Sequence, residues 1–292
     1  MEMRKMSYKT EQYKNCERFN EQYPEIYRFL LRAGTMEHNT HFHWGRFAWM
    51  QGHSLLDADR LTAITLFKDA LGEMVGMLTY DTFYDDRAYL IHSSSDPQLL
   101  NRMIDAVLET EAGPATIKVN AKDEALIERL RARRFEQRRK DVSVLALDLS
   151  SPLEFAVPAG YAISPEEFRF DHWQYQLVVH RGFDNEGLPV PWEEKVFAHG
   201  ADTSIKTFAI ADGAYCAHCG VWYTEGATAY IEPVVTLPEH RRKGLARAVV
   251  YAACQRARTL GARRAIVLSD QEFYYKIGFR RVSEVYCWEK NA

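Results

Sequence analysis

The residues best suited to bind an anionic ligand form one short turn between a β-type run and a long predicted helix. They are Arg241, Arg242, Lys243, Gly244, Leu245, Ala246 and Arg247. The first N–H groups of a helix have no intrahelical acceptor and point outward at the positive end of its dipole. Gly244 and Ala246 let a ligand approach the main chain. The turn is therefore predicted to bind a pyrophosphate, although it matches neither GxxxxGK[ST] nor GxGxxG.

The same turn resembles motif A of the GNAT acyltransferases, R/Q-x-x-G-x-G/A. Arg241, Gly244 and Ala246 hold its three defining positions. Downstream, the run from Tyr274 to Phe279 resembles the Y-x-x-x-G-F ending of the same family. Residues 205–290 are thus similar to a GNAT domain, an α/β fold built on a mixed sheet.

The resemblance implies acetyl-CoA, or another acyl-CoA, as the co-substrate. It places main-chain groups of Val234, Val235 and Thr236 beside the pantetheine arm. It places residues 242–247 around the pyrophosphate. The physical argument agrees, since an extended arm can lie along an open strand edge and Pro233 suits an edge or a bulge.

Acyl transfer requires an amine to lose a proton, an oxyanion to be stabilised and a thiolate to leave. Glu232 is the predicted general base, because alternation places it on the face of Val234 and a partly buried carboxylate can have a raised pKa. A salt-bridged structural role is the alternative. Tyr274 is the predicted general acid, since the family has this tyrosine near the thioester sulfur; simple packing is its alternative. The N–H of Val234 or Val235 can polarise the thioester carbonyl.

The elements that must position these residues follow from hydrophobic periodicity. In the second half, helices are predicted over about 165–180, 191–199, 241–260 and 271–276, with strands over 207–211, 215–223, 228–236, 265–268 and 282–290. In the first half, helices are predicted over 8–34, 97–110 and 123–133, with strands over 61–67, 74–80, 116–119 and 142–149. Each strand–helix–strand part is expected to be parallel.

The two halves align with each other. Gly76 and Gly220 are separated by the same number of residues as Phe135 and Phe279, which indicates a tandem duplication. The first half lacks motif A, since residues 92–98 read HSSSDPQ. We therefore predict two tandem GNAT-like domains: a degenerate one over 1–150, and one with motif A over 151–292.

Composition excludes several classes of protein. The length of 292 residues predicts about two domains. The formal net charge of -3 predicts no nucleic-acid partner. No run approaches the roughly 18 apolar residues of a membrane helix. The charged N-terminus and five scattered cysteines favour a cytoplasmic protein with reduced thiols.

No metal is predicted. Cys216 and Cys219 lie in an expected strand, where residues three apart face opposite sides, and no second pair follows. His41 and His43 have no evident third ligand, so aromatic packing with Trp44 is favoured. The two helices expected to cover the acceptor site carry four aromatic residues, for which core packing or a cation-binding pocket are the alternatives. These are Trp173, Tyr175, Phe183 and Trp192.

Together these features predict an acetyl-CoA-dependent N-acetyltransferase that acts on a primary amine, such as a small-molecule acceptor, by direct attack in a ternary complex. The alternatives are a different acyl donor and a non-catalytic acyl-CoA-binding module. A monomer or a homodimer is expected.

Overall fold

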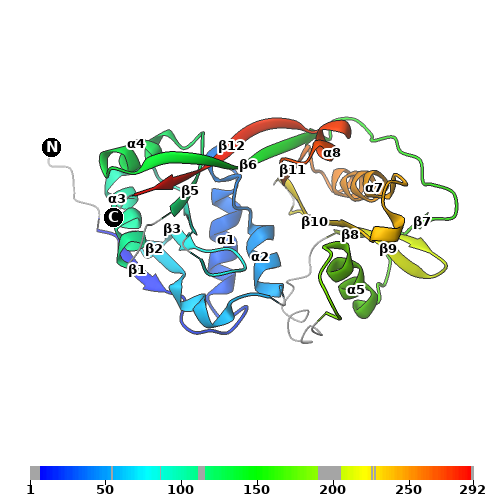
Figure 1. Cartoon of the computed structure of the whole chain (residues 1–292). Helices are drawn as coiled ribbons and strands as arrows, with labels where there is room; N and C mark the ends of the chain where they lie inside the picture. The colour runs from blue at the N-terminus through cyan, green and yellow to red at the C-terminus, as the bar shows by residue number, and fades with distance from the viewer. Residues whose placement is uncertain are drawn as a thin grey trace. The chain divides into compact units, whose positions relative to one another are not determined.

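The computed structural model describes residues 7–53, 55–85, 87–110, 116–189, 205–224, 226 and 228–290. The chain forms two compact units (Figure 1). Unit 1 comprises Met1–Val144, Leu268–Asp270 and Arg281–Ala292. Unit 2 comprises Leu145–Val267 and Gln271–Arg280. Strand β6 (Glu136–Asp148) therefore contributes to both units, and most of the last strand, β12 (Arg280–Glu289), belongs to unit 1.

Unit 1 is a twisted sheet with helices around it. Its other elements are β1 (Lys9–Gln12), α1 (Tyr23–Ala33), η1 (Glu37–Asn39), α2 (Trp44–Gly52), η2 (Ala58–Ala63), β2 (Thr65–Lys68), β3 (Met74–Thr79), β4 (Arg87–His92), α3 (Pro97–Thr110), β5 (Thr116–Asn120) and α4 (Glu124–Ala132). The strand order is β1-β2-β3-β4-β5-β12-β6. Side chains of α3 and α4 pack with Phe67, Leu78 and Leu90 into one buried cluster on a face of this sheet.

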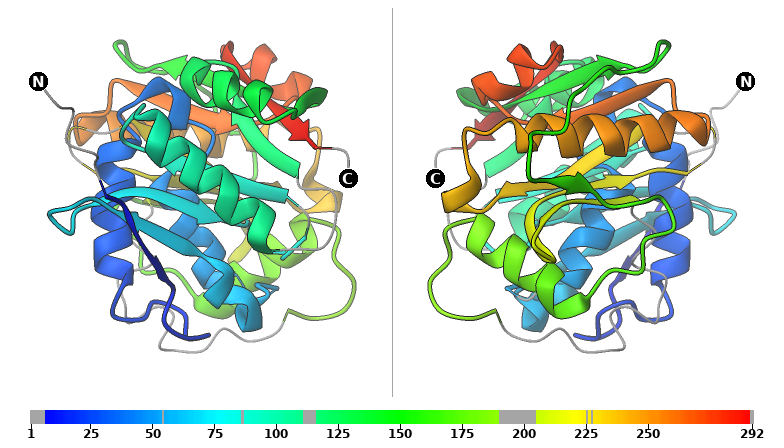
Figure 2. Two further views of the ribbon diagram at one scale, coloured as in Figure 1. Left: turned by 90° about the vertical axis from the view of Figure 1, so that its left-hand side faces the viewer. Right: turned by 90° about the vertical axis from the view of Figure 1, so that its right-hand side faces the viewer.

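Unit 2 carries the candidate site. Its elements are β7 (Ala162–Ile163), α5 (His172–Gly182), β8 (Ile205–Ala211), β9 (Ala214–Trp222), β10 (Ala229–Thr236), η3 (Pro238–His240), α7 (Leu245–Thr259), β11 (Arg264–Leu268) and α8 (Glu272–Lys276). The strand order is β6-β11-β10-β9-β8-β7. Helices α5 and α7 cover opposite faces of this sheet (Figure 2). Helix α7 presents Leu245, Val249 and Ala253 to the sheet, so its apolar side packs into the hydrophobic core of unit 2.

The duplication is confirmed at the level of the fold. Both halves run strand–strand–strand–helix–strand–helix–strand, from β2 to β6 and from β8 to β12. The β10–β11 crossover is parallel, as predicted, and so is the β4–β5 crossover. The hairpin turn at Asp212 and Gly213 has positive φ at both residues, 49° and 79°, as a two-residue hairpin turn requires.

Two parts of the sequence prediction need correction, and a third is not tested. The predicted helix over 8–34 is wrong at its start: residues Lys9–Gln12 form β1, and α1 begins only at Tyr23, next to Pro24. The charged, short β1 has no apolar alternation, so nothing marked it as a strand. Strands β4 and β7 were not predicted. The helix over 191–199 falls outside the described residues.

The predicted domain boundary after residue 150 remains a prediction. The two compact units differ from the predicted domains, since unit 2 begins at Leu145 and unit 1 includes Arg281–Ala292. No helix or strand lies between β6 and β7. Among the residues described, no helix is both long enough and apolar enough to span a membrane.

Candidate functional site

The candidate site begins where two parallel strands part. Strand β10 pairs with β11 only at Ala229 and Tyr230, although β10 continues to Thr236. On its other side, β10 remains paired with β9 as far as Thr236. Within the described chain, the edge of β10 that faces away from β9 therefore has no neighbouring strand from Ile231 onward. An extended ligand can form main-chain hydrogen bonds at such an edge.

A β-bulge lies at the start of this open edge. Ile231 pairs with Val221 and Val234 pairs with Cys219, so two residues of β10, Glu232 and Pro233, lie opposite Gly220. A Cβ atom on Gly220 would lie only 2.5 Å from the main-chain oxygen of Glu232. The bulge thus depends on a glycine across the ladder, and Pro233 lies in a bulge as its chemistry predicted.

The bulge corrects one predicted relation. Simple alternation placed Glu232 and Val234 on one face of the sheet, and this is wrong. The extra residue brings Val234 to the face of Ile231, where it packs against the core under α7. Glu232 instead shares the face of Tyr230, the face covered by α5, where Val235 packs against Gly182.

Two neighbours hold Glu232 in place. The Tyr230 hydroxyl donates a hydrogen bond to Glu232 Oε2 at 2.6 Å. The Trp222 Nε1–H donates to the Glu232 main-chain oxygen at 2.8 Å. Tyr230 is 1% exposed, whereas Glu232 is partly exposed. Neither Tyr230 nor Trp222 was singled out from the sequence, because an i, i+2 contact acquires meaning only once both residues are known to share a strand face.

Tyr274 lies on the opposite face, in the buried cluster beneath α7. Its ring packs edge-on against Phe279, with ring centroids 5.4 Å apart. Burial raises the pKa of Tyr274 well above its ordinary value, and the nearby Cys219 and Glu232 act in the same direction. The phenol is therefore neutral at physiological pH, the state in which it can donate a proton.

The basic turn has the backbone geometry of an anion cradle. Arg242 and Gly244 both have positive φ, 60° and 85°, so the main chain turns sharply into α7. Among the described residues other than its chain neighbours, Pro158 Cγ alone lies within 4 Å of a Cβ built on Gly244, at 3.9 Å. The first main-chain bond of α7 in the described chain runs from Ala248 N to Gly244 O. The preceding N–H groups, including that of Ala246, thus have no helical acceptor.

The basic side chains of the turn divide into two groups. Arg241 is held by the protein itself: it donates to the main-chain oxygens of Thr236 and Gly182 and pairs with Asp184 at 2.9 Å. Arg242, Lys243 and Arg247 are exposed. Lys243 Nζ lies 3.1 Å from the Tyr161 hydroxyl, and the Arg247 guanidinium lies over the Tyr251 ring.

These features fit the acyl-CoA that the sequence predicts. Thr236 Oγ1, at the end of the open edge, is buried without a hydrogen-bond partner among the described residues. Gly244 leaves room beside the helix start, and exposed cationic groups surround it. The Thr236 hydroxyl and the strand edge can form hydrogen bonds with an amide-containing arm. The main-chain N–H groups of the turn can form hydrogen bonds with a pyrophosphate.

The four aromatic residues noted in the sequence do not act as a group. Tyr175 is buried among Phe170, Phe208 and His218, so core packing is confirmed for it. Trp173 and Phe183 are 42% and 50% exposed. Trp192 lies outside the described residues. Lys206 was not singled out from the sequence. Its Nζ lies over the Phe170 and Tyr175 rings, and burial lowers the pKa of its ammonium group to about 7.

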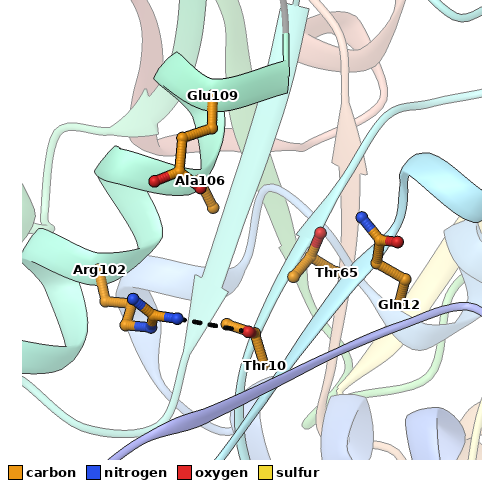
Figure 3. A pocket seen from close by; sticks show the side chains of 6 residues that line it. All are labelled: Thr10, Gln12, Thr65, Arg102, Ala106 and Glu109. Carbon is orange, nitrogen blue, oxygen red and sulfur yellow. Dashed lines mark hydrogen bonds between the residues drawn. The ribbon is translucent and has the colours of Figure 1, made fainter.

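Unit 1 contains two further polar features. In the part of the chain that the structure describes, His38, His92 and Asp123 form the one group whose ligand atoms lie close enough to share a metal, within 4.8 Å. His92 Nε2 and Asp123 Oδ2 are 2.8 Å apart, a contact that a hydrogen bond explains. A cavity of about 490 Å³ lies between β1, β2 and α3 (Figure 3). It is lined by Thr10, Gln12, Thr65, Arg102, Ala106 and Glu109.

The comparisons with known proteins agree with this geometry. The model of the acetyltransferase (GNAT) family matches residues 160–279. A tandem GNAT protein from the clavulanic acid biosynthesis pathway is 16% identical, with 97% of this chain and 98% of that chain covered and a TM-score of 0.58. No curated protein sequence matches significantly.

Two further solved structures share the fold. A GCN5-related N-acetyltransferase from Sphaerobacter thermophilus is 13% identical over 97% of this chain and 95% of that chain, with a TM-score of 0.54. One from Kribbella flavida is 16% identical over 75% and 88%, with a TM-score of 0.52. Residues 160–279 are therefore an acetyltransferase (GNAT) domain, and the chain as a whole shares the fold of a tandem GNAT protein, with a first half that lacks motif A.

Proposed function

We propose that this protein is an N-acetyltransferase that transfers an acetyl group from acetyl-CoA to a primary amine of a small molecule, by direct attack in a ternary complex. The observation that carries the proposal is the continuity of the site in unit 2. The open edge of β10 begins at the bulge with Glu232 and ends near the cationic turn before α7. One extended acyl-CoA can therefore place its pyrophosphate at the turn and its thioester beside the bulge.

Each residue then has a defined part in the reaction. Val234, Val235 and Thr236 bind the pantetheine arm through their main chain. The turn from Arg242 to Arg247 binds the pyrophosphate, and Arg241 fixes the turn to β10 and α5. Glu232 accepts a proton from the amine, directly or through water, on the α5 face. Tyr274 protonates the departing thiolate.

The first experiment is a calorimetric titration of the protein with acetyl-CoA. Wild type is expected to bind with micromolar affinity. The double variant Gly244→Trp with Arg242→Glu is expected to lose binding, because an indole fills the turn and a carboxylate repels the pyrophosphate. A matched control, Gly213→Trp with Arg263→Glu, makes the same chemical changes at a hairpin tip and an exposed position elsewhere in unit 2. Absence of binding to folded wild type would overturn the site.

Catalysis is tested separately by thiol release from acetyl-CoA in the presence of a panel of primary amines. Glu232→Gln is expected to bind acetyl-CoA with wild-type affinity and to lower kcat by about 100-fold, the usual scale for general base catalysis. Turnover faster with propionyl-CoA or succinyl-CoA would favour a different donor. Binding without turnover of any amine would favour a non-catalytic acyl-CoA-binding module.

A further inference from the structure

We propose that Tyr230 is the positioning residue of the general base: its hydroxyl fixes the carboxylate of Glu232 on the acceptor face of β10. The inference rests on the proposed function, in which Glu232 takes the proton from the amine. It concerns a residue that neither motif A nor the Y-x-x-x-G-F ending contains.

The first support is the geometry of the contact. Tyr230 and Glu232 are two residues apart on one strand, and the hydroxyl-to-Oε2 distance is 2.6 Å, typical of a charge-assisted O–H···O⁻ bond. The Tyr230 side chain is 1% exposed, so its hydroxyl is fixed by the packing of the ring. A partly exposed carboxylate thus takes its orientation from a buried donor.

The second support is that the main chain of the same residue is held independently. Trp222 Nε1–H donates to the Glu232 oxygen at 2.8 Å, and Gly220 lies in close contact behind that oxygen. Trp222 lies directly opposite Tyr230 in the β9–β10 ladder. Residues that pair across the ladder thus hold Glu232 at both ends, one at the backbone and one at the carboxylate. A catalytic group needs positioning of this kind, to within about half an ångström.

The hydrogen bond also has an electrostatic consequence. A donor bonded to the charged form of a carboxylate makes that form more stable. Removing the hydroxyl should therefore move the titration midpoint of the Glu232 carboxyl to higher pH, by about one unit. It also removes one of the contacts that orient the side chain, so the fraction of molecules with a correctly placed base should fall.

The test is Tyr230→Phe, which removes one oxygen and keeps the buried ring. The first readout is a pH titration of ¹³C-labelled glutamate carboxyls by NMR in the acetyl-CoA complex, with Glu232 assigned by its absence in Glu232→Gln. The second is the pH profile of kcat for the best amine in the panel. We expect an upward shift of about one pH unit in both, a fall in kcat of about 10-fold and an unchanged KM for acetyl-CoA.

The chain provides a matched control. Tyr286 donates to Glu284 Oε2 at 2.7 Å, again across two residues of one strand, but in unit 1. Tyr286→Phe should leave kcat and the Glu232 titration unchanged. A Tyr230→Phe protein with the wild-type titration and kcat overturns the inference. If Glu232→Gln keeps full kcat, the proposed base itself fails, whatever Tyr230→Phe does, so the two failures are distinguishable.

Discussion

At the scale of single residues, two equivalent glycines serve different purposes. A Cβ on Gly220 would meet the Glu232 main-chain oxygen at 2.5 Å, a rigid obstacle. A Cβ on Gly76, its counterpart in the other half, would meet the Met103 sulfur at 3.0 Å, the flexible end of a side chain. Unit 2 therefore requires its glycine for close backbone approach, whereas unit 1 requires space for a helix side chain.

This difference leads to a paired prediction. Gly220→Ala should lower the free energy of unfolding by about 2 kcal/mol and weaken acetyl-CoA binding, since the bulge must shift. Gly76→Ala should cost less than about 1 kcal/mol, because Met103 can move and alanine restricts the unfolded chain. Urea unfolding and calorimetry measure both effects. Equal costs, or an unchanged affinity in Gly220→Ala, would contradict this account of the bulge.

The buried His218 should make the stability of the protein depend on pH. Burial lowers the pKa of His218 to about 3, and the nearby Lys206 acts in the same direction. The unfolded chain takes up a proton on this residue near pH 6.5, whereas the folded chain does not. Stability is therefore fully present above about pH 6.5 and is lost progressively as the pH falls, by about 2 kcal/mol at pH 5.

The measurement is the free energy of unfolding between pH 7.5 and 5. In His218→Phe, which retains stacking on Phe208, the loss of stability between pH 7.5 and 5 should be smaller by about 2 kcal/mol, because the unfolded chain no longer takes up this proton. An unchanged slope in His218→Phe would show that the folded state also binds this proton.

At the scale of elements, the two halves differ most where the helix follows the third strand. Helix α7 starts from Gly244, with no side chain at its cap. Helix α3 starts at Pro97, which has no N–H, and the Asp96 carboxylate accepts the Gln98 N–H at 2.9 Å and the Tyr8 hydroxyl. The Asp96 carboxylate thus already accepts a hydrogen bond from a free N–H group at the start of α3. A phosphate bound there would be repelled by its negative charge.

We therefore predict one acetyl-CoA per chain. Native mass spectrometry with excess acetyl-CoA should show a single mass increment, and calorimetry should give a stoichiometry of one. Asp96→Ala should leave the stoichiometry at one, because the Ser93–Asp96 turn still lacks glycine and basic side chains. Two increments in wild type would show that a second site exists beyond motif A.

At the scale of the whole molecule, the end of the chain completes a unit that begins at the other end. Residues Val285–Glu289 of β12 pair with Asn120–Thr116 of β5, and Trp288 is buried in the core of unit 1. A chain cut after residue 150, the predicted domain boundary, lacks this strand and leaves one edge of β5 unpaired.

We predict that residues 1–150 alone do not unfold cooperatively, whereas residues 1–150 joined through a flexible linker to 281–292 do. In the full chain, Trp288→Ala should cost about 3–5 kcal/mol of unit 1 stability, the usual cost for a large buried ring. Circular dichroism during thermal unfolding measures both. A cooperative transition of 1–150 alone, with the stability of the joined form, would make β12 dispensable.

The sequence by itself determined many of the helices and strands and marked the basic turn before α7 as a candidate ligand site. Strong apolar periodicity located α3 and α7, and paired turn residues located the hairpins. The equal separation of Gly76 and Gly220, and of Phe135 and Phe279, established the duplication. These features are local, so each is visible within a short window of residues.

The tertiary structure alone decided which residues meet. The bulge at Glu232 and Pro233 reversed the face of Val234, because strand alternation holds only while both strands of a pair advance together. The contact of Tyr230 with Glu232, the bond between Arg241 and Asp184, and the place of β12 in unit 1 likewise depend on pairing across strands and loops. Hydrophobic periodicity specifies that a strand has two faces, but only its neighbours determine which side chains share one.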